Sequence, residues 1–405
     1  MTLPRVVITG TGAFTACGAG ADTLWAAARD GVSAVGHVDF PVLTNQRVFR
    51  AAHIDDTLFQ AHAVDYKPRF QDRVAAFALV AADEAVKMAG LSKEDFGEET
   101  GVIVGSGFGG AETLDVNYRA FERGELRMDP MSIPKIMTNA AASWISMTYG
   151  ARGPVYCNST ACSSASQSIG MAYMLMRSGA IRRCITGGTE ASVVTGVFRA
   201  WEVLRVLSPD LCRPFCQKRN GMALGEGAGI LVLETLDDAQ ARGATILAEI
   251  VGYGTSSDAG DLLRPDFEGA ARAMQLALAD AGIQPADIGY VNAHGTGTVA
   301  NDLSETNAMR LVFGDDFDKV AVSSTKPVHG HALGAAGAIE AIVTIEALRN
   351  QLAPPTTNYS TLDPAVGFQP VHGEARAIDT NFCLTNSFAF GGVNASLILG
   401  NAPDQ

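Results

Sequence analysis

The sequence has few charged residues and lacks any long apolar segment. Asp, Glu, Lys and Arg make up 18% of its 405 residues, whereas hydrophobic residues make up 47%. This balance excludes an intrinsically disordered chain, because disorder requires little hydrophobic surface and a high net charge. The apolar run from Val74 to Ala82 is far shorter than the roughly 20 residues of a membrane-spanning helix. We therefore expect a globular protein that does not enter a membrane.

Cysteine is scarce, and its pattern is typical neither of disulfides nor of structural zinc. The seven cysteines are an odd number, are scattered along the chain and form no Cys-x-x-Cys pair. A disulfide framework and a zinc site are therefore not expected. The apolar stretch near the start ends at Gly10, which is too early for a secretion signal. We expect a cytosolic protein with reduced thiols.

Basic residues are outnumbered, and the net charge is −13. Proteins that bind nucleic acids usually carry a basic stripe, so the charge argues against such a partner. The local exception is the segment 199–219. Its basic residues are Arg199, Arg205, Arg213, Lys218 and Arg219, and its acidic residues are Glu202 and Asp210. This segment is suited to docking an acidic partner; an ordinary solvated loop is the alternative.

β-Branched runs alternate with Ala-rich segments along the whole chain, which predicts an α/β fold with largely buried strands. Strands are predicted at Val6–Thr9, Gly101–Gly105, Cys184–Gly187, Gly229–Glu234, Tyr290–Ala293 and Ala321–Ser323. Helices are predicted at Arg73–Met88, Ser163–Ser178, Glu268–Ala281, Glu305–Leu311 and Ala335–Leu348. Gly252-Tyr-Gly-Thr echoes Gly10-Thr-Gly-Ala, which suggests two similar halves that meet near residue 250.

Two glycine-rich segments are not nucleotide-binding loops. Gly10-Thr-Gly-Ala-Phe-Thr has Thr15 where a dinucleotide fingerprint has its third glycine, so a tight turn is predicted there. Gly105-Ser-Gly-Phe-Gly-Gly lacks the Gly-Lys-Ser/Thr ending of a phosphate loop. The sequence therefore does not predict a bound nucleotide.

Cys162 is a candidate nucleophile. It follows an extended segment and begins a helix of small residues, where the positive end of the helix dipole favours the thiolate. An inert buried cysteine is the alternative. His294 ends a buried strand, and His331 leads into an Ala- and Gly-rich helix whose N-terminus would keep the ring neutral. The other histidines, including His329, are interpreted as surface or locally hydrogen-bonded groups.

These residues stand in motifs that resemble the β-ketoacyl-acyl carrier protein synthases, which have the thiolase fold. The motifs are Thr160-Ala-Cys-Ser-Ser, Asn292-Ala-His-Gly-Thr-Gly-Thr, Lys326 with Gly330-His331, and Asn386-Ser-Phe-Ala-Phe-Gly-Gly-Val-Asn. The resemblance covers essentially the whole chain. It implies a five-layered αβαβα body made of two pseudo-repeated halves. The expected halves are residues 1–250, with the nucleophilic cysteine, and residues 251–405, with both catalytic histidines.

The resemblance implies a decarboxylative condensation. Cys162 would accept an acyl group from a carrier-protein thioester, and His294 and His331 would act on the malonyl group delivered by a second carrier. Backbone N–H groups of Cys162 and Phe390 would hold the oxyanion, and Phe390 would also gate the acyl pocket. Lys326 and Glu305 would support this site. No metal and no organic cofactor are expected.

Further positions follow from the same resemblance. Phe108 would line the acyl pocket and restrict chain length, and Arg213 would meet the acidic carrier protein at the entrance. The chain would form a homodimer, or a heterodimer with a chain-length factor, with 138–144 as a candidate interface. Fatty-acid synthesis and specialised polyketide or polyene synthesis both remain open as the pathway.

Three rival interpretations were compared with these motifs. A degradative thiolase would need a second cysteine late in the chain, where Asn386-Ser-Phe-Ala stands instead. An initiating synthase would have asparagine in place of one histidine, whereas His331 is present. A non-catalytic chain-length factor typically lacks the nucleophile, whereas this chain keeps Cys162. That third reading remains the alternative to a condensing enzyme.

Overall fold

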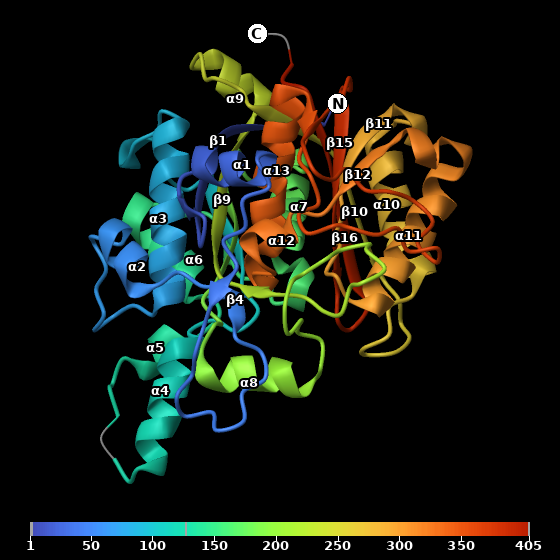
Figure 1. Cartoon of the computed structure of the whole chain (residues 1–405). Helices are drawn as coiled ribbons and strands as arrows, with labels where there is room; N and C mark the ends of the chain where they lie inside the picture. Colours follow the sequence, from blue (N-terminus) through green and yellow to red (C-terminus); the bar gives the residue numbers. More distant parts are fainter. Residues whose placement is uncertain (1–2, 126–127, 404–405) are drawn as a thin grey trace.

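The computed structural model describes residues 3–125 and 128–403. At its centre, strands from both parts of the chain form a single mixed 11-stranded sheet (Figure 1). From one edge to the other, the strands are β12 (Ala321–Ser323), β11 (Ile288–Asn292), β15 (Phe382–Ala389), β16 (Val393–Gly400), β10 (Ala248–Ser257), β1 (Val6–Thr15), β9 (Gly227–Thr235), β7 (Arg183–Glu190), β5 (Thr100–Gly105) and β6 (Val155–Tyr156). The short strand β2 (Gly18–Ala19) pairs with β1.

The two halves of this sheet have the same topology. Counting outward from the centre, β1, β9, β7, β5 and β6 correspond to β10, β16, β15, β11 and β12. In each half the inner pairs are antiparallel and the two outer pairs are parallel. A short antiparallel pairing of β1 with β10 joins the halves. The predicted pseudo-repeat is confirmed; the boundary at residue 250 falls inside β10 and stays a prediction.

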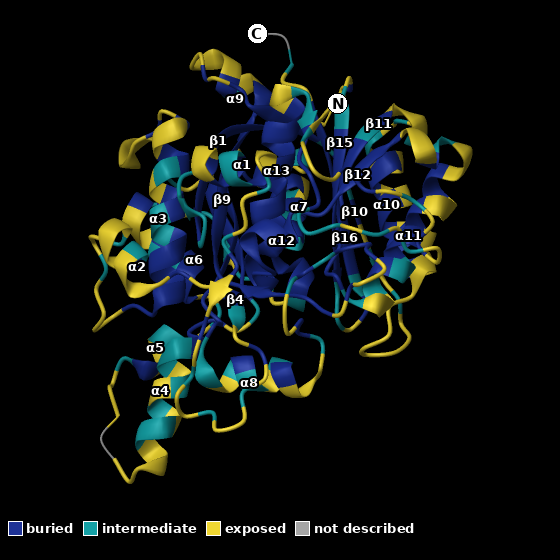
Figure 2. Ribbon diagram, viewed as in Figure 1, coloured by how far each residue is buried: buried dark blue, intermediate teal, exposed yellow. Residues whose placement is uncertain are grey.

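Helices form the other layers. On one outer face α3 (Arg73–Met88) packs with α6 (Ala140–Tyr149), and on the other α10 (Phe267–Ala281) packs with α11 (Val299–Phe313). Between the two half-sheets lie α7 (Ser164–Arg177) and α13 (Ala336–Asn350) (Figure 1). Every residue of α13 from Ala336 to Leu348 is buried, as a helix covered on all sides must be (Figure 2). The five-layered architecture is confirmed.

The other α-helices and strands lie outside these layers or at their edges. They are α1 (Ala21–Arg29), α2 (Asp56–His62), α4 (Ala111–Glu122), α5 (Ser132–Ile136), α8 (Thr195–Val203), α9 (Leu236–Ala241), α12 (Lys326–His329), β3 (Gly36–His37), β4 (Arg50–Ala52), β8 (Leu224–Gly225), β13 (Leu352–Ala353) and β14 (Arg376–Ala377). In the part of the chain that the structure describes, no helix has the length and apolar character needed to cross a membrane.

The glycine pair Gly10 and Gly12 does not form the predicted tight turn. Strand β1 continues to Thr15, with an irregularity in register before Gly10. A Cβ atom on either glycine would lie 2.0 Å from a carbonyl oxygen of α3, so only glycine lets the helix backbone approach this closely. Gly252 and Gly254 of β10 have the same relation to α10. The echo between the two segments therefore reflects repeated helix–strand packing.

Local signals set several helix ends. The Asp72 side chain accepts a hydrogen bond from Val74 N at the start of α3, and α10 ends at Gly282 in a left-handed conformation. The helix predicted at 305–311 is longer, because Thr298 caps α11 and its side chain accepts from Asn301 N. Apolar periodicity is weak over the first turns of α11, so the sequence pattern indicated only its centre.

Candidate active site

Cys162 lies in a strained turn that leads into the central helix α7. The short 3₁₀ helix Ala161–Ser163 precedes α7, and Ala161 has a φ of 51°, which is rare outside glycine. Hydroxyl groups brace the turn: Ser164 Oγ accepts from Thr160 N at 2.9 Å and donates to Ala161 O at 2.7 Å. The Cys162 side chain is only 6% exposed but lines a cavity.

The second half repeats this turn without the sulfur. A 3₁₀ helix, Leu333–Ala335, precedes α13, and Leu333 has a φ of 44°. Gly334 has the position in this turn that Cys162 has in the turn of the first half. The Gly334 N–H donates to Glu190 Oε2 at 3.0 Å. The duplicated fold thus places one nucleophile, from the first half, beside groups from the second half.

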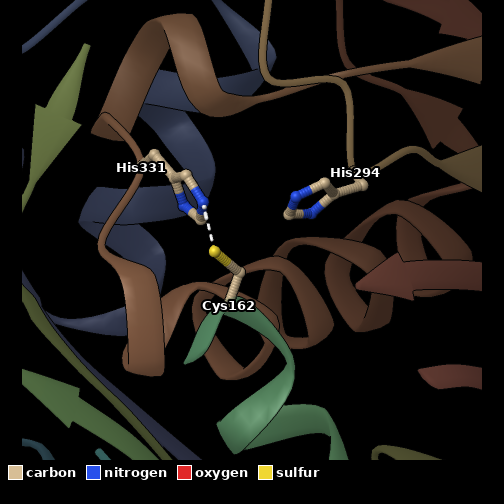
Figure 3. A group of neighbouring side chains, drawn as sticks. All are labelled: Cys162, His294 and His331. Carbon is tan, nitrogen blue, oxygen red and sulfur yellow. Dashed lines mark hydrogen bonds between the residues drawn. The ribbon is translucent and has the colours of Figure 1, made fainter. Parts of the chain in front are cut away.

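The structure brings both predicted histidines to Cys162 (Figure 3). His331 Nε2 lies 3.1 Å from Cys162 Sγ. The His294 and His331 rings are 5.3 Å apart in a T-shaped arrangement. His331 is held by its backbone, since its N–H donates to Ala223 O at 2.8 Å and its carbonyl accepts from Gly225 N at 2.9 Å. A thiol and two imidazoles therefore share one buried space.

Lys326 orients His294. The Lys326 Nζ atom lies 3.3 Å from His294 Nδ1 and forms an ion pair with Glu340, and both charged side chains are fully buried. An ammonium group only donates hydrogen bonds, so Nδ1 of His294 is the acceptor and Nε2 carries the ring proton. Glu340 was missed by the sequence analysis. The available signal was a carboxylate within the run 335–343, whose other residues are all small or apolar, because a charge buried there requires a partner.

Glu305 supports the site through the backbone of His294. Its carboxylate accepts from the backbone N–H groups of His294 and Gly295, each at 2.8 Å, and from Asn386 Nδ2 at 3.3 Å. It therefore fixes the backbone turn that carries His294. Its carboxylate is not the ion partner of Lys326, which is Glu340.

Burial controls the protonation of these groups. It raises the pKa of Cys162 to about 12, although the Lys326 charge acts in the opposite direction. The prediction that the helix terminus favours a thiolate at rest is therefore wrong. The pKa values of His294 and His331 are lowered well below the usual range, first by burial and then by the Lys326 charge. Both rings are neutral, as expected, but burial is the main cause. The resting site holds a thiol and two neutral imidazoles.

Phe390 lies at the entrance to Cys162. Its ring stacks on Trp201 with centroids 5.8 Å apart, and its backbone N–H lowers the pKa of the Cys162 thiol, against the larger effect of burial. Both rings line the cavity above Cys162, which has a volume of about 190 Å³. Gly391 and Gly392 follow with φ values of +84° and +67°, which explains the glycine pair after this aromatic residue.

Two predicted positions do not line the cavity above Cys162. Phe108 is 42% exposed and is not among the residues that line the cavity. The N–H groups of Gly107 and Phe108 both donate to Glu190, at 2.8 and 3.1 Å, which fixes the loop that carries Phe108. Arg213 is only 16% exposed and is paired with Asp210 at 2.9 Å. The roles assigned to Phe108 and Arg213 from the sequence therefore stay predictions.

The basic segment is also largely neutralised by pairing. Arg199 pairs with Glu202, and Arg219 pairs with Asp363. Arg205 and Lys218 are exposed, and neither forms an ion pair within residues 3–125 and 128–403. The segment is therefore less basic at its surface than its composition indicates.

Comparisons with known proteins agree with this site. Residues 4–239 match the family model "Beta-ketoacyl synthase, N-terminal domain", and residues 247–360 match "Beta-ketoacyl synthase, C-terminal domain". Nodulation protein E of Rhizobium sp. (strain N33) is 42% identical over 398 residues, which cover 97% of this chain and 98% of that protein. The 3-oxoacyl-[acyl-carrier-protein] synthase 2 of Staphylococcus aureus (strain COL) is 40% identical over 403 residues, 97% of each chain.

A solved structure, the ishigamide ketosynthase/chain length factor, superposes with a TM-score of 0.94 at 34% identity and covers 99% of this chain and 100% of that chain. The match therefore extends over the fold, both halves of the sequence and the residues around Cys162. This chain belongs to the β-ketoacyl synthase family.

Proposed function

We propose that this chain joins an acyl group held on Cys162 to a malonyl unit delivered on acyl carrier protein, with loss of carbon dioxide. The observation that carries the proposal is the 3.1 Å contact between Cys162 Sγ and His331 Nε2, beside a second neutral histidine. A carrier-linked substrate is supported by the name of the Staphylococcus aureus relative. Nothing in this reaction requires a metal or an organic cofactor.

In the first step the Cys162 sulfur attacks the thioester carbonyl. Because the thiol is protonated at rest, its proton passes to His331 Nε2 as the new S–C bond forms. We assign stabilisation of the oxyanion to the backbone N–H groups of Cys162 and Phe390; the Phe390 N–H already lowers the pKa of the Cys162 thiol. The bond to the carrier thiol then breaks, and that thiol leaves with the proton held by His331.

In the second step the malonyl group loses carbon dioxide and leaves an enolate oxygen. His294 donates its Nε2 proton toward that oxygen, and His331 is the second donor when its Nε2 carries the proton. A single well-placed donor in a water-excluded site is worth roughly 3 kcal/mol. The enolate carbon attacks the acyl carbonyl, the C–C bond forms, and the C–S bond to Cys162 breaks. The released sulfur takes up a proton from solvent by way of His331 Nε2, which restores the resting thiol.

The carrier protein docks on the rim of the cavity rather than on Arg213. Three exposed apolar residues line this cavity: Leu204, Leu262 and Leu263. Arg264 lines the same cavity, and exposed Arg205 lies between the lining residues Leu204 and Val206. An apolar rim with two cations suits the acidic carrier implied by the sequence motifs, whereas Arg213 is occupied by Asp210.

A second subunit covers the β6 edge of the sheet. This edge is unpaired in a single chain, and the exposed residues Phe108, Met137, Met147 and Tyr156 cluster in the segments beside it. Of the candidate interface 138–144, residues 140–142 are buried within the chain against α3, whereas the other four are partly or fully exposed. A homodimer and a heterodimer with a chain-length factor both fit this edge, and light scattering of the purified chain distinguishes them.

Acyl transfer to Cys162 is the direct test. The wild-type chain is incubated with acyl-loaded carrier protein under metal-free conditions, and the intact mass is measured. We expect one acyl adduct that maps to Cys162 and is absent in Cys162→Ala, with Cys17→Ser as the matched control. A chain without an adduct, and without carbon dioxide release from malonyl carrier, would be a non-catalytic chain-length factor instead.

A further inference from the structure

Cys162, His294 and His331 form a set of potential metal ligands. Each offers one ligand atom, and these atoms all lie within 4.8 Å of one another. Zinc binds sulfur at about 2.3 Å and imidazole nitrogen at about 2.0–2.1 Å, so tetrahedral ligand atoms lie roughly 3.3–3.6 Å apart. The Sγ–Nε2 distance between Cys162 and His331 is already 3.1 Å. Side-chain shifts on the order of 1 Å complete the geometry.

We propose that these three side chains bind Zn²⁺ reversibly and that the bound ion inhibits the enzyme. All three line the cavity, which supplies both an entry path and space for a water molecule as the fourth ligand. On binding, the Cys162 thiol releases its proton to solvent and its sulfur forms a Zn–S bond, while the hydrated ion keeps one water and releases its other waters. The sulfur electron pair is then no longer available for attack on a thioester. The ion is an inhibitor and not a resident cofactor.

The ligand types favour zinc over the abundant hard cations. One thiolate and two imidazoles suit Zn²⁺, whereas Mg²⁺ and Ca²⁺ prefer oxygen ligands. The metal binds in place of water and substrate, because the same sulfur and rings face the cavity. This inference depends on the observed ligand set and does not require the proposed acyl substrate.

Lys326 limits the affinity. Because Lys326 Nζ donates to Nδ1 of His294, ligation through Nε2 requires the ring proton to shift to Nδ1, where it faces the ammonium group. Glu340 offers Lys326 another acceptor, so the shift weakens binding without preventing it. Replacing both residues by apolar side chains, as Lys326→Met with Glu340→Leu, therefore strengthens zinc binding.

Calorimetric titration of metal-free protein with zinc chloride tests the site. We expect one site per chain, unchanged in Cys17→Ser, which alters a half-buried thiol that does not line the cavity. In Cys162→Ser and in His331→Ala the affinity falls by more than the roughly 10- to 100-fold that loss of a second-shell partner costs. Magnesium chloride gives no binding. Equal zinc affinity in wild type and Cys162→Ser would overturn the proposal.

Two further measurements identify the ligands without using enzyme turnover. Cobalt(II) as a probe should give a thiolate-to-metal charge-transfer band in wild type and lose it in Cys162→Ser. Zinc should slow alkylation of Cys162 by iodoacetamide, and EDTA should restore the rate. A cobalt spectrum without the thiolate band, or an alkylation rate that zinc does not change, would contradict Cys162 as a metal ligand. The acyl-adduct experiment uses metal-free protein, so either proposal can fail alone.

Discussion

Replacing Lys326 by methionine tests whether this lysine positions His294 or only balances a buried charge. In the wild type its ammonium is fully buried and pairs with Glu340. Removing one partner of a buried ion pair costs about 3–5 kcal/mol of unfolding free energy. The pKa of Glu340 is already raised to about 7 by burial, so the abandoned carboxylate takes up a proton easily. We therefore expect Lys326→Met to lose unfolding free energy near the lower end of that range.

The same change removes the hydrogen bond that fixes the His294 tautomer. Lys326 Nζ lies 3.3 Å from His294 Nδ1, and without it the ring proton is free to move to Nδ1. The enolate then loses one oriented donor, which costs roughly 3 kcal/mol or about 100- to 1,000-fold in the condensation rate. Acyl loading of Cys162 depends on His331 and should fall much less.

The double variant Lys326→Met, Glu340→Leu separates the two effects. It replaces the pair by apolar side chains of similar size, which is often neutral for stability. We expect chemical denaturation to show restored stability, while malonyl decarboxylation and condensation remain slow. Recovery of both stability and condensation rate in the double variant would refute a positioning role for Lys326.

Three other changes give distinct outcomes. Gly12→Ala places a Cβ 2.0 Å from a carbonyl oxygen of α3, and we expect thermal denaturation to show a loss of unfolding free energy above about 3 kcal/mol. The control Gly36→Ala adds a Cβ that contacts nothing and should leave the unfolding free energy unchanged. Trp201→Ala removes the ring stacked on Phe390 and should speed alkylation of Cys162; an unchanged rate would exclude Trp201 from the gate. Burial raises the pKa of Glu226 to about 8, so its contribution to stability is fully present below its unfolded pKa near 4.5 and is lost as the pH rises toward 8. Denaturation curves should therefore show the unfolding free energy of wild type, relative to Glu226→Gln, falling by up to about 1.4 kcal/mol per pH unit between pH 4.5 and pH 8. If this difference in unfolding free energy does not change with pH, the raised pKa of Glu226 is contradicted.

Local patterns predicted the elements and the three central side chains, because these signals lie within a few residues. The helix Arg73–Met88 is confirmed at both ends, since Asp72 caps it and apolar residues repeat along it. Cys162, His294 and His331 were recognised because each stands in its own motif. That these three side chains lie together depends on the fold. The motifs indicated the fold only through their resemblance to those of a known family.

The errors arose where distant contacts override local chemistry. Gly10 and Gly12 have the composition of a turn, and only the approach of α3 explains them as strand residues. The helix terminus at Cys162 favours a thiolate locally, but burial by the whole molecule raises the pKa. Each error concerns a quantity that depends on neighbours outside the motif.

The duplicated topology explains why one chain has one active site. Helices α7 and α13 are equivalent in the two halves, and both lie in the central layer where the half-sheets meet. Each begins with a turn that has a positive φ, at Ala161 and at Leu333. The first turn carries the sulfur, and the second follows His331 directly. Because the thiol belongs to one copy and both rings belong to the other, neither half contains a complete set, and catalysis requires the packing of the two halves.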